Sequence, residues 1–229
     1  MLTEYEVQAL LLSLKIASVA VVVSLPFGVI CAWLLARCQF VGKSLLDGLV
    51  HLPLVLPPVV IGYLLLVVMG RQGAVGKVLY EWFGLTFSFS WRGAVLAVAV
   101  VSFPLMVRSI RLALESVDYK LEQAARTLGA SPLKVFFTIT LPLTLPGVLT
   151  GAILAFARAL GEFGATITFV SNIPGETQTI PLAMYSFIET PGAEDQAARL
   201  CVIAIVIALA SIFASEWFSR MAKQRLEAR

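Results

Sequence analysis

Long stretches without a charged side chain restrict this chain to few folds. Residues 49–70 contain no Asp, Glu, Lys or Arg over 22 residues, and residues 16–36 contain none over 21. A helix needs about 20 mostly apolar residues to cross the hydrocarbon core of a bilayer. Charged residues make up 14% of the chain, whereas a soluble domain has about 25%. The sequence therefore predicts an integral membrane protein.

Five apolar stretches predict about five membrane-spanning helices in one all-α domain covering residues 1–229. The expected spans are residues 10–36, 49–70, 91–112, 143–170 and 200–218. A further apolar stretch, Ile180–Ile188, is too short to cross, so we expect an interfacial or periplasmic helix there. Prolines lie within the first three spans and bend helices. Such prolines are about equally consistent with kinks that serve helix packing and with a transport path through the bundle.

The distribution of basic residues predicts the orientation of the chain, because Lys and Arg are retained on the cytoplasmic side. We take the loops after the first and third spans and the C-terminal tail as cytoplasmic. The inside then holds eleven basic residues, namely Arg37, Lys43, Arg108, Arg111, Lys120, Arg126, Lys134, Arg220, Lys223, Arg225 and Arg229. The outside holds four, namely Arg71, Lys77, Arg92 and Arg199. We therefore expect a periplasmic N-terminus and a cytoplasmic C-terminus.

The loop at residues 113–142 is expected to contain two short helices. Asp118 is a predicted N-cap, and Gly129 fits the left-handed conformation that ends a helix. Glu122 and Arg126 have the i, i+4 spacing of an intrahelical ion pair. Ser131 and Pro132 then begin a second helix, which is expected to end where the fourth span begins.

The first of these helices has one apolar face, formed at i, i+3, i+4 and i+7 by Leu121, Ala124, Ala125 and Leu128. Helices that rest on lipid favour Trp, Phe and several Leu on such a face. Small alanines instead suit close approach to another protein. We therefore predict a docking helix, with a helix lying on the lipid interface as the alternative.

This loop resembles the EAA loop of the membrane subunits of bacterial ABC importers. The matching residues are Gln123–Gly129, followed by Phe136, Ile139 and Leu141–Pro142. The family's usual glutamate is Gln123 here, with Glu122 just before it. The resemblance implies a coupling helix seated in a groove of an ATPase subunit. The coupling residues would be Leu121, Glu122, Gln123, Ala124, Ala125, Leu128, Gly129, Leu141 and Pro142.

The resemblance covers about residues 11–217 and is strongest for the oxyanion permeases, molybdate permeases in particular. It rests on residues 51–58, 121–129 and 157–164, in which sulfate permeases are also similar. It implies a type I importer permease in the bacterial inner membrane that acts as a homodimer surrounded by lipid. Its other partners would be an ATPase subunit, which binds ATP and Mg, and a periplasmic oxyanion-binding protein. This chain itself would hold no cofactor. The alternatives to molybdate as the substrate are tungstate, sulfate and thiosulfate.

Two ionisable residues, Arg158 and Glu162, lie well inside the fourth predicted span. A charge at the bilayer centre costs about 2.5–3.5 kcal/mol, so each needs a polar partner or a cavity. Their i, i+4 spacing places them on one helix face, and Gly161 and Gly164 allow close helix approach or a break. One interpretation is a gate or anion path in which Arg158 attracts the anion. The other is an ion pair that fixes helix packing.

Other classes of function have less support. Residues 41–44 read Val-Gly-Lys-Ser, but Arg37 stands where a phosphate-binding loop needs its first glycine. We therefore expect no nucleotide site and no enzymatic activity in this chain. The sequence has no metal-ligand spacing, and its net charge of +3 does not indicate nucleic-acid binding. A secondary transporter usually has two related halves, and this sequence shows no such internal repeat. A membrane scaffold without transport activity is the remaining alternative.

Overall fold

The computed structural model describes residues 2–227, without the side chains of residues 219 and 221–227. Arg229 and the side chains of Lys223 and Arg225, which entered the charge count, lie outside the described residues. The described part is helical and has no strand, which confirms the all-α class. Its elements are α1 (Glu4–Arg37), α2 (Lys43–Val55), α3 (Pro58–Met69), α4 (Ala74–Phe83), α5 (Trp91–Ser116), α6 (Tyr119–Thr127), α7 (Pro132–Val135), the π-helix η1 (Phe136–Thr140), α8 (Leu141–Leu160), α9 (Gly164–Val170), α10 (Ile180–Ile188) and α11 (Glu194–Glu227).

Within residues 2–227, four helices are long and apolar enough to cross a membrane. They are α1, α5, residues Glu194–Phe218 of α11, and the continuous helix Pro132–Leu160 made by α7, η1 and α8. The bent pair of α2 and α3 gives a fifth if it is counted as one span. The predicted number of about five is therefore confirmed, and α10 has the bounds expected for the short helix.

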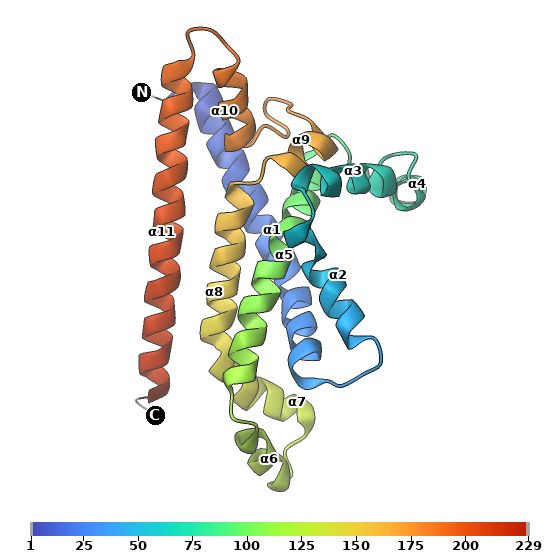
Figure 1. The fold of residues 1–229 in the computed structure, drawn as a ribbon, viewed down its shortest axis with the longest axis vertical. Coiled ribbons are helices and arrows are strands. Elements are labelled where there is room, and N and C mark those ends of the chain that lie inside the picture. The colour runs from blue at the N-terminus through green and yellow to red at the C-terminus, as the bar shows by residue number, and fades with distance from the viewer. Residues whose placement is uncertain (1, 228–229) are drawn as a thin grey trace.

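The helices α1, α5 and α8 pack against one another and form the centre of the bundle, with α11 against α8 (Figure 1). Small residues fill many of the buried positions between them, among them Ala17, Ala20, Ala94, Ala97 and Ala155. Lipid tails are as apolar as leucine, so helices in a membrane associate by close packing, which small residues permit.

The predicted span at residues 49–70, in which prolines were expected to bend the helix, is two helices joined at a sharp break. The axes of α2 and α3 differ in direction by 116° across the break after Val55. Pro57 and Pro58 have no backbone N–H to continue the helix, and Leu56 takes the extended conformation that precedes proline. The chain therefore leaves α2, turns and begins α3 with Pro58 in its first turn. In Figure 1, α3 and α4 project sideways from the bundle.

The predicted span at residues 143–170 is not one helix, and its start differs from the prediction. Its helix stops at Leu160, and after a break at residues 161–163 the separate helix α9 begins. At the other end, the expected boundary at Leu141–Pro142 is absent, because the helix runs from Pro132 through η1 into α8. The N–H of Leu141 donates to the carbonyl of Phe136, five residues back. This π-type turn widens the helix just before Pro142, whose ring would clash with a regular α-helical backbone.

The two breaks lie side by side, because α3 packs on α9. A Cβ atom on Gly62 of α3 would lie 2.6 Å from the carbonyl oxygen of Ala165 and 2.9 Å from Cβ of Thr168. A Cβ atom on Gly164 of α9 would lie 2.9 Å from Cβ of Pro58. Glycines on both helices thus allow the two half-helices to touch.

Replacing Gly62 with alanine is expected to lower stability by about 1–3 kcal/mol, the usual effect of overpacking. The added methyl would meet backbone of α9, which cannot move aside as a flexible side chain can. Gly48→Ala is a matched control, because an added Cβ in α2 meets nothing within 4 Å. Thermal unfolding in detergent measures both variants. A transition temperature equal to wild type for Gly62→Ala would contradict the close packing of α3 on α9.

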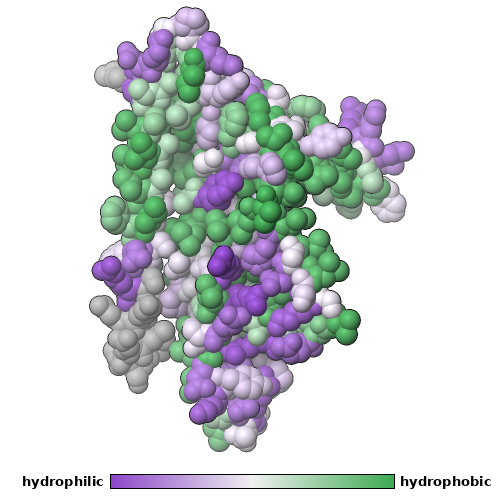
Figure 2. All heavy atoms as spheres, viewed as in Figure 1, coloured by the Kyte–Doolittle hydropathy of each residue, from purple (hydrophilic) through white to green (hydrophobic). Residues whose placement is uncertain are grey.

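The three segments predicted to be cytoplasmic lie toward one end of the bundle. They are the loop between α1 and α2, the α6–α7 region, and the end of α11; the N-terminus and the α10–α11 loop lie at the other end (Figure 1). Figure 2 shows hydrophilic side chains gathered over α6 and α7, whereas apolar side chains cover much of α11 and α3. The arrangement fits the predicted topology; which end faces the cytoplasm stays a prediction from charge.

Candidate functional site

Short-range contacts fix both ends of α6. The carboxylate of Asp118 accepts a hydrogen bond of 2.9 Å from the N–H of Lys120, as expected of an N-cap. After the helix, Gly129 has φ +83°, in the left-handed region. The hydroxyl of Ser131 then accepts a hydrogen bond from the N–H of Lys134 and begins α7. The predicted helix, turn and helix start are thus confirmed.

The apolar face of α6 is turned away from the rest of the chain. Leu128 is 89% exposed and Leu121 is 49% exposed, while Ala124 is exposed and Ala125 half-buried. Leu133 and Phe137, on the helix that follows, are also exposed apolar residues of this loop. An uncovered apolar patch rimmed by polar residues marks an interaction site.

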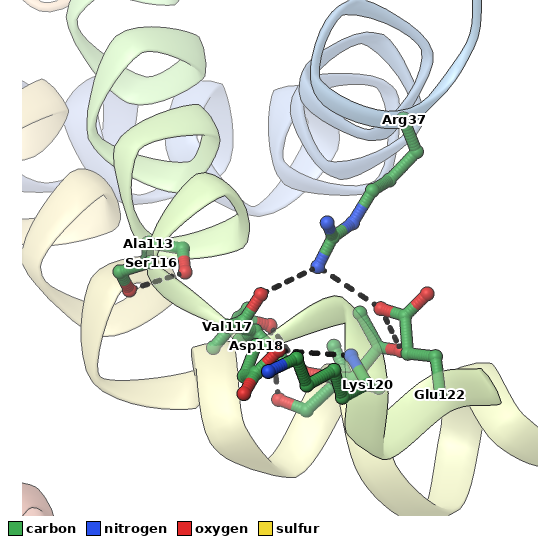
Figure 3. Close-up of polar contacts among 10 residues, drawn as sticks. Arg37, Ala113, Ser116, Val117, Asp118, Lys120 and Glu122 are labelled. Carbon is green, nitrogen blue, oxygen red and sulfur yellow. Dashed lines mark hydrogen bonds and ion pairs between the residues drawn. The ribbon is translucent and has the colours of Figure 1, made fainter. Parts of the chain in front are cut away.

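One side chain fastens α6 to the rest of the chain. Glu122 is its only buried residue, and its Oε1 lies 3.0 Å from Nη2 of Arg37, in the last turn of α1. The same oxygen accepts a hydrogen bond of 3.0 Å from the hydroxyl of Thr140 in η1. Figure 3 shows the Arg37 guanidinium reaching from α1 between Val117 and Glu122. The predicted Glu122–Arg126 pair is therefore wrong: Arg126 is exposed, and the buried carboxylate binds the arginine of another helix.

Arg37 and Thr140 were not among the residues predicted for this site. Arg37 lies 85 residues before Glu122, and a lone arginine at the end of a span indicates orientation and nothing more. No local pattern indicates a partner so distant in the chain. The remaining predicted coupling residues divide into two groups. Gln123 is exposed on α6, whereas Leu141 and Pro142 lie beyond η1 in the Pro132–Leu160 helix.

Arg158 and Glu162 form an ion pair, with Nη2 and Oε2 2.7 Å apart. The Glu162 side chain is 2% exposed and that of Arg158 is 31% exposed. Glu162 also accepts a hydrogen bond of 2.8 Å from the N–H of Ala165 through its other oxygen, Oε1. The carboxylate therefore spans the break between α8 and α9. Gly161 lies in this break, and Gly164 lies against the first residue of α3.

A protein-family model described as "Binding-protein-dependent transport system inner membrane component" matches residues 24–227. The chain belongs to this family. The resemblance to ABC importer membrane subunits is thereby confirmed, as is the expected location of this permease in the inner membrane.

Curated relatives of this permease cover nearly its whole length. It is 70% identical over 224 residues to the molybdenum transport system permease protein ModB of Escherichia coli (strain K12), which covers 98% of each chain. It is 67% identical over 221 residues to ModB of Haemophilus influenzae, covering 96% of each chain. A probable sulfate transport system permease protein, cysT of Chlorella vulgaris, is 39% identical over 183 residues, or 80% of this chain and 68% of that one.

Solved structures with the same fold share little sequence with this permease. A bacterial ABC transporter involved in the import of the acidic polysaccharide alginate aligns with a TM-score of 0.75 at 17% identity, over 96% of this chain and 80% of that one. The MetNI methionine ABC transporter, in inward-facing conformations, aligns with a TM-score of 0.67 at 16% identity, over 96% and 99%. At these identities the likeness establishes the fold of an importer permease.

Proposed function

We propose that this permease carries molybdate across the bacterial inner membrane, driven by ATP hydrolysis in a partner subunit. The observation that supports the substrate most directly is 70% and 67% identity, over nearly the whole chain, to two molybdenum transport permeases. The sulfate relative is much more distant, at 39%.

The ATPase partner is proposed to bind the exposed apolar face of α6. Leu121 and Leu128 would enter its groove, and Gly129 would let the chain turn sharply at the edge of the contact. ATP and Mg would be bound by that subunit, and this chain would need no cofactor. Two copies of the permease would form the path, and a periplasmic binding protein would deliver the anion. In support of that last partner, the alginate transporter has been solved with a bound periplasmic protein.

The Arg158–Glu162 pair is proposed as part of the outer gate or anion path. It sits where α8 gives way to α9, next to the break between α2 and α3. Irregular backbone at membrane depth is tolerated only inside the protein or along a water-filled cavity. The partly exposed guanidinium of Arg158 could attract a dianion while Glu162 holds it in place.

The test is ATP hydrolysis and anion uptake by the reconstituted importer in proteoliposomes. Binding protein is added loaded with molybdate, tungstate or sulfate. We expect the molybdate-loaded protein to stimulate both hydrolysis and uptake, and the sulfate-loaded protein to stimulate neither. Stimulation by the sulfate-loaded protein alone, or uptake without ATP, would contradict the proposal.

A further inference from the structure

We propose that Arg37 is a positioning residue that ties α6 to α1. Movement of α6 would then reach the outer end of the bundle through α1 as well as through the Pro132–Leu160 helix. This inference rests on the proposed function, because it assumes that an ATPase subunit moves α6.

The contacts of Arg37 converge on the junction between α5 and α6. Its Nη2 donates to the carbonyl of Val117, the residue that ends α5, over 3.2 Å. The same nitrogen lies 3.0 Å from Oε1 of Glu122, and the guanidinium carbon lies 5.7 Å from the ring centroid of Tyr119. Arg37 therefore holds the last turn of α1 against both the end of α5 and the first turns of α6 (Figure 3).

Burial makes this contact a strong tertiary restraint on α6. Glu122 is the only buried residue of that helix, and its side chain and that of Arg37 are 6% and 16% exposed. Two charges so shielded from water must stay paired, because separating them leaves one of them buried without compensation. The planar guanidinium also fixes direction, since its N–H groups bind acceptors only in a defined plane. The pair thus restrains the orientation of α6 as well as its position.

At its other end, α1 is held by buried polar contacts with the elements of the outer side. Glu6 is fully buried and lies 3.0 Å from Nε of Arg199 in α11. The hydroxyl of Ser13 accepts a hydrogen bond of 2.7 Å from the N–H of Ile180, the first residue of α10.

The helix α1 therefore links α6 to the outer side without interruption. It is one continuous helix of 34 residues, or about 51 Å at 1.5 Å per residue. The Pro132–Leu160 helix, by comparison, ends at Leu160, and a break separates it from α9. A displacement of α6 can therefore act on α10 and α11 through a helix with polar anchors at both ends.

The test compares Arg37→Met, Arg37→Lys and Glu122→Gln in the reconstituted importer with its ATPase and molybdate-loaded binding protein. The readout is the number of ATP molecules hydrolysed per anion imported, beside the amount of ATPase that co-purifies. Arg220→Met is the matched control, because Arg220 forms an exposed ion pair with Glu216 within α11.

For Arg37→Met and Glu122→Gln we expect normal assembly and continued hydrolysis, with ATP used per anion raised at least about fivefold, a typical lower bound for coupling between sites. Arg37→Lys should rescue part of the coupling, since it keeps the charge but not the planar donor group. Arg220→Met should match wild type.

Hydrolysis and uptake that fall in proportion would indicate a merely structural role and overturn the inference. An unchanged ratio in both Arg37→Met and Glu122→Gln would also overturn it. If Arg37→Met fails to assemble, Arg37→Lys and Glu122→Gln give the decisive ratio. A wild-type complex that imports no oxyanion would instead contradict the proposed function itself, so the two failures are distinguishable.

Discussion

Replacing Gly129 with aspartate is expected to reduce ATP-driven anion uptake to background while the permease still inserts in the membrane. Gly129 has φ +83°, and a Cβ atom there meets nothing within 4 Å in this chain. A residue other than glycine costs about 1–2 kcal/mol in this conformation, which is too little to unfold the bundle. The new carboxylate would instead stand at the edge of the apolar surface proposed to enter the ATPase. Labelled molybdate uptake and immunodetection of the membrane protein measure the two quantities.

Gly84→Asp separates backbone strain from docking. Gly84 ends α4 with φ +65° and also has no atom within 4 Å of an added Cβ. It lies on the lateral projection of α3 and α4, far from α6 in Figure 1. This variant should therefore retain uptake. Equal loss of uptake in Gly84→Asp and Gly129→Asp, or normal uptake in Gly129→Asp, would contradict docking at the α6 turn.

Arg158→Ala is expected to lower uptake at least about tenfold, equivalent to about 1.4 kcal/mol, without changing assembly with the ATPase. Arg158 is the only basic residue of α8, and its partly exposed side chain is the cation available to an anion at the break. Glu162 would keep its hydrogen bond from the N–H of Ala165, so α9 should stay in place. Uptake in proteoliposomes and co-purification of the ATPase provide the two readouts.

The double variant Arg158→Ala, Glu162→Gln distinguishes the anion path from the packing role. In the single variant the buried carboxylate of Glu162 loses its cation, which is itself destabilising. In the double variant the neutral amide of Gln replaces this carboxylate, so no buried charge is left unpaired. Uptake should nevertheless stay low if Arg158 attracts the anion. Restored uptake in the double variant, or failure of Arg158→Ala to assemble, would favour an ion pair that only fixes helix packing.

The parts of the fold that depend on local chemistry could be predicted from the sequence. The hydropathy of 16–36 and 91–112 is enough for α1 and α5, because any apolar segment of that length must satisfy its backbone as a helix. The bounds of α6 follow from the side chain of Asp118 and the backbone freedom of Gly129, both of which act within a few residues.

What could not be predicted depends on direction and on distant partners. A window over 49–70 measures apolar content, which is unaffected by the 116° change of direction at Leu56. The prolines there indicated a bend but not its size. Likewise, Glu122 had a suitable local partner in Arg126, and only the packing of α1 beside α6 brings Arg37 within 3.0 Å of it. For Gly161 and Gly164 the sequence left open a close helix approach or a break, and the structure shows both: the helix ends at Leu160, and Gly164 lies against Pro58 of α3.

The most direct test of the docking claim is site-specific photo-crosslinking from position 128 in the assembled importer. A photoreactive residue replaces Leu128, which is 89% exposed on α6, and a second variant carries it at Ile188, 68% exposed on α10 at the other end of the bundle. We predict that light joins the Leu128 variant to the ATPase subunit and leaves the Ile188 variant free of it. An assembled complex in which position 128 gives no ATPase adduct, or gives no more than position 188, would contradict the account.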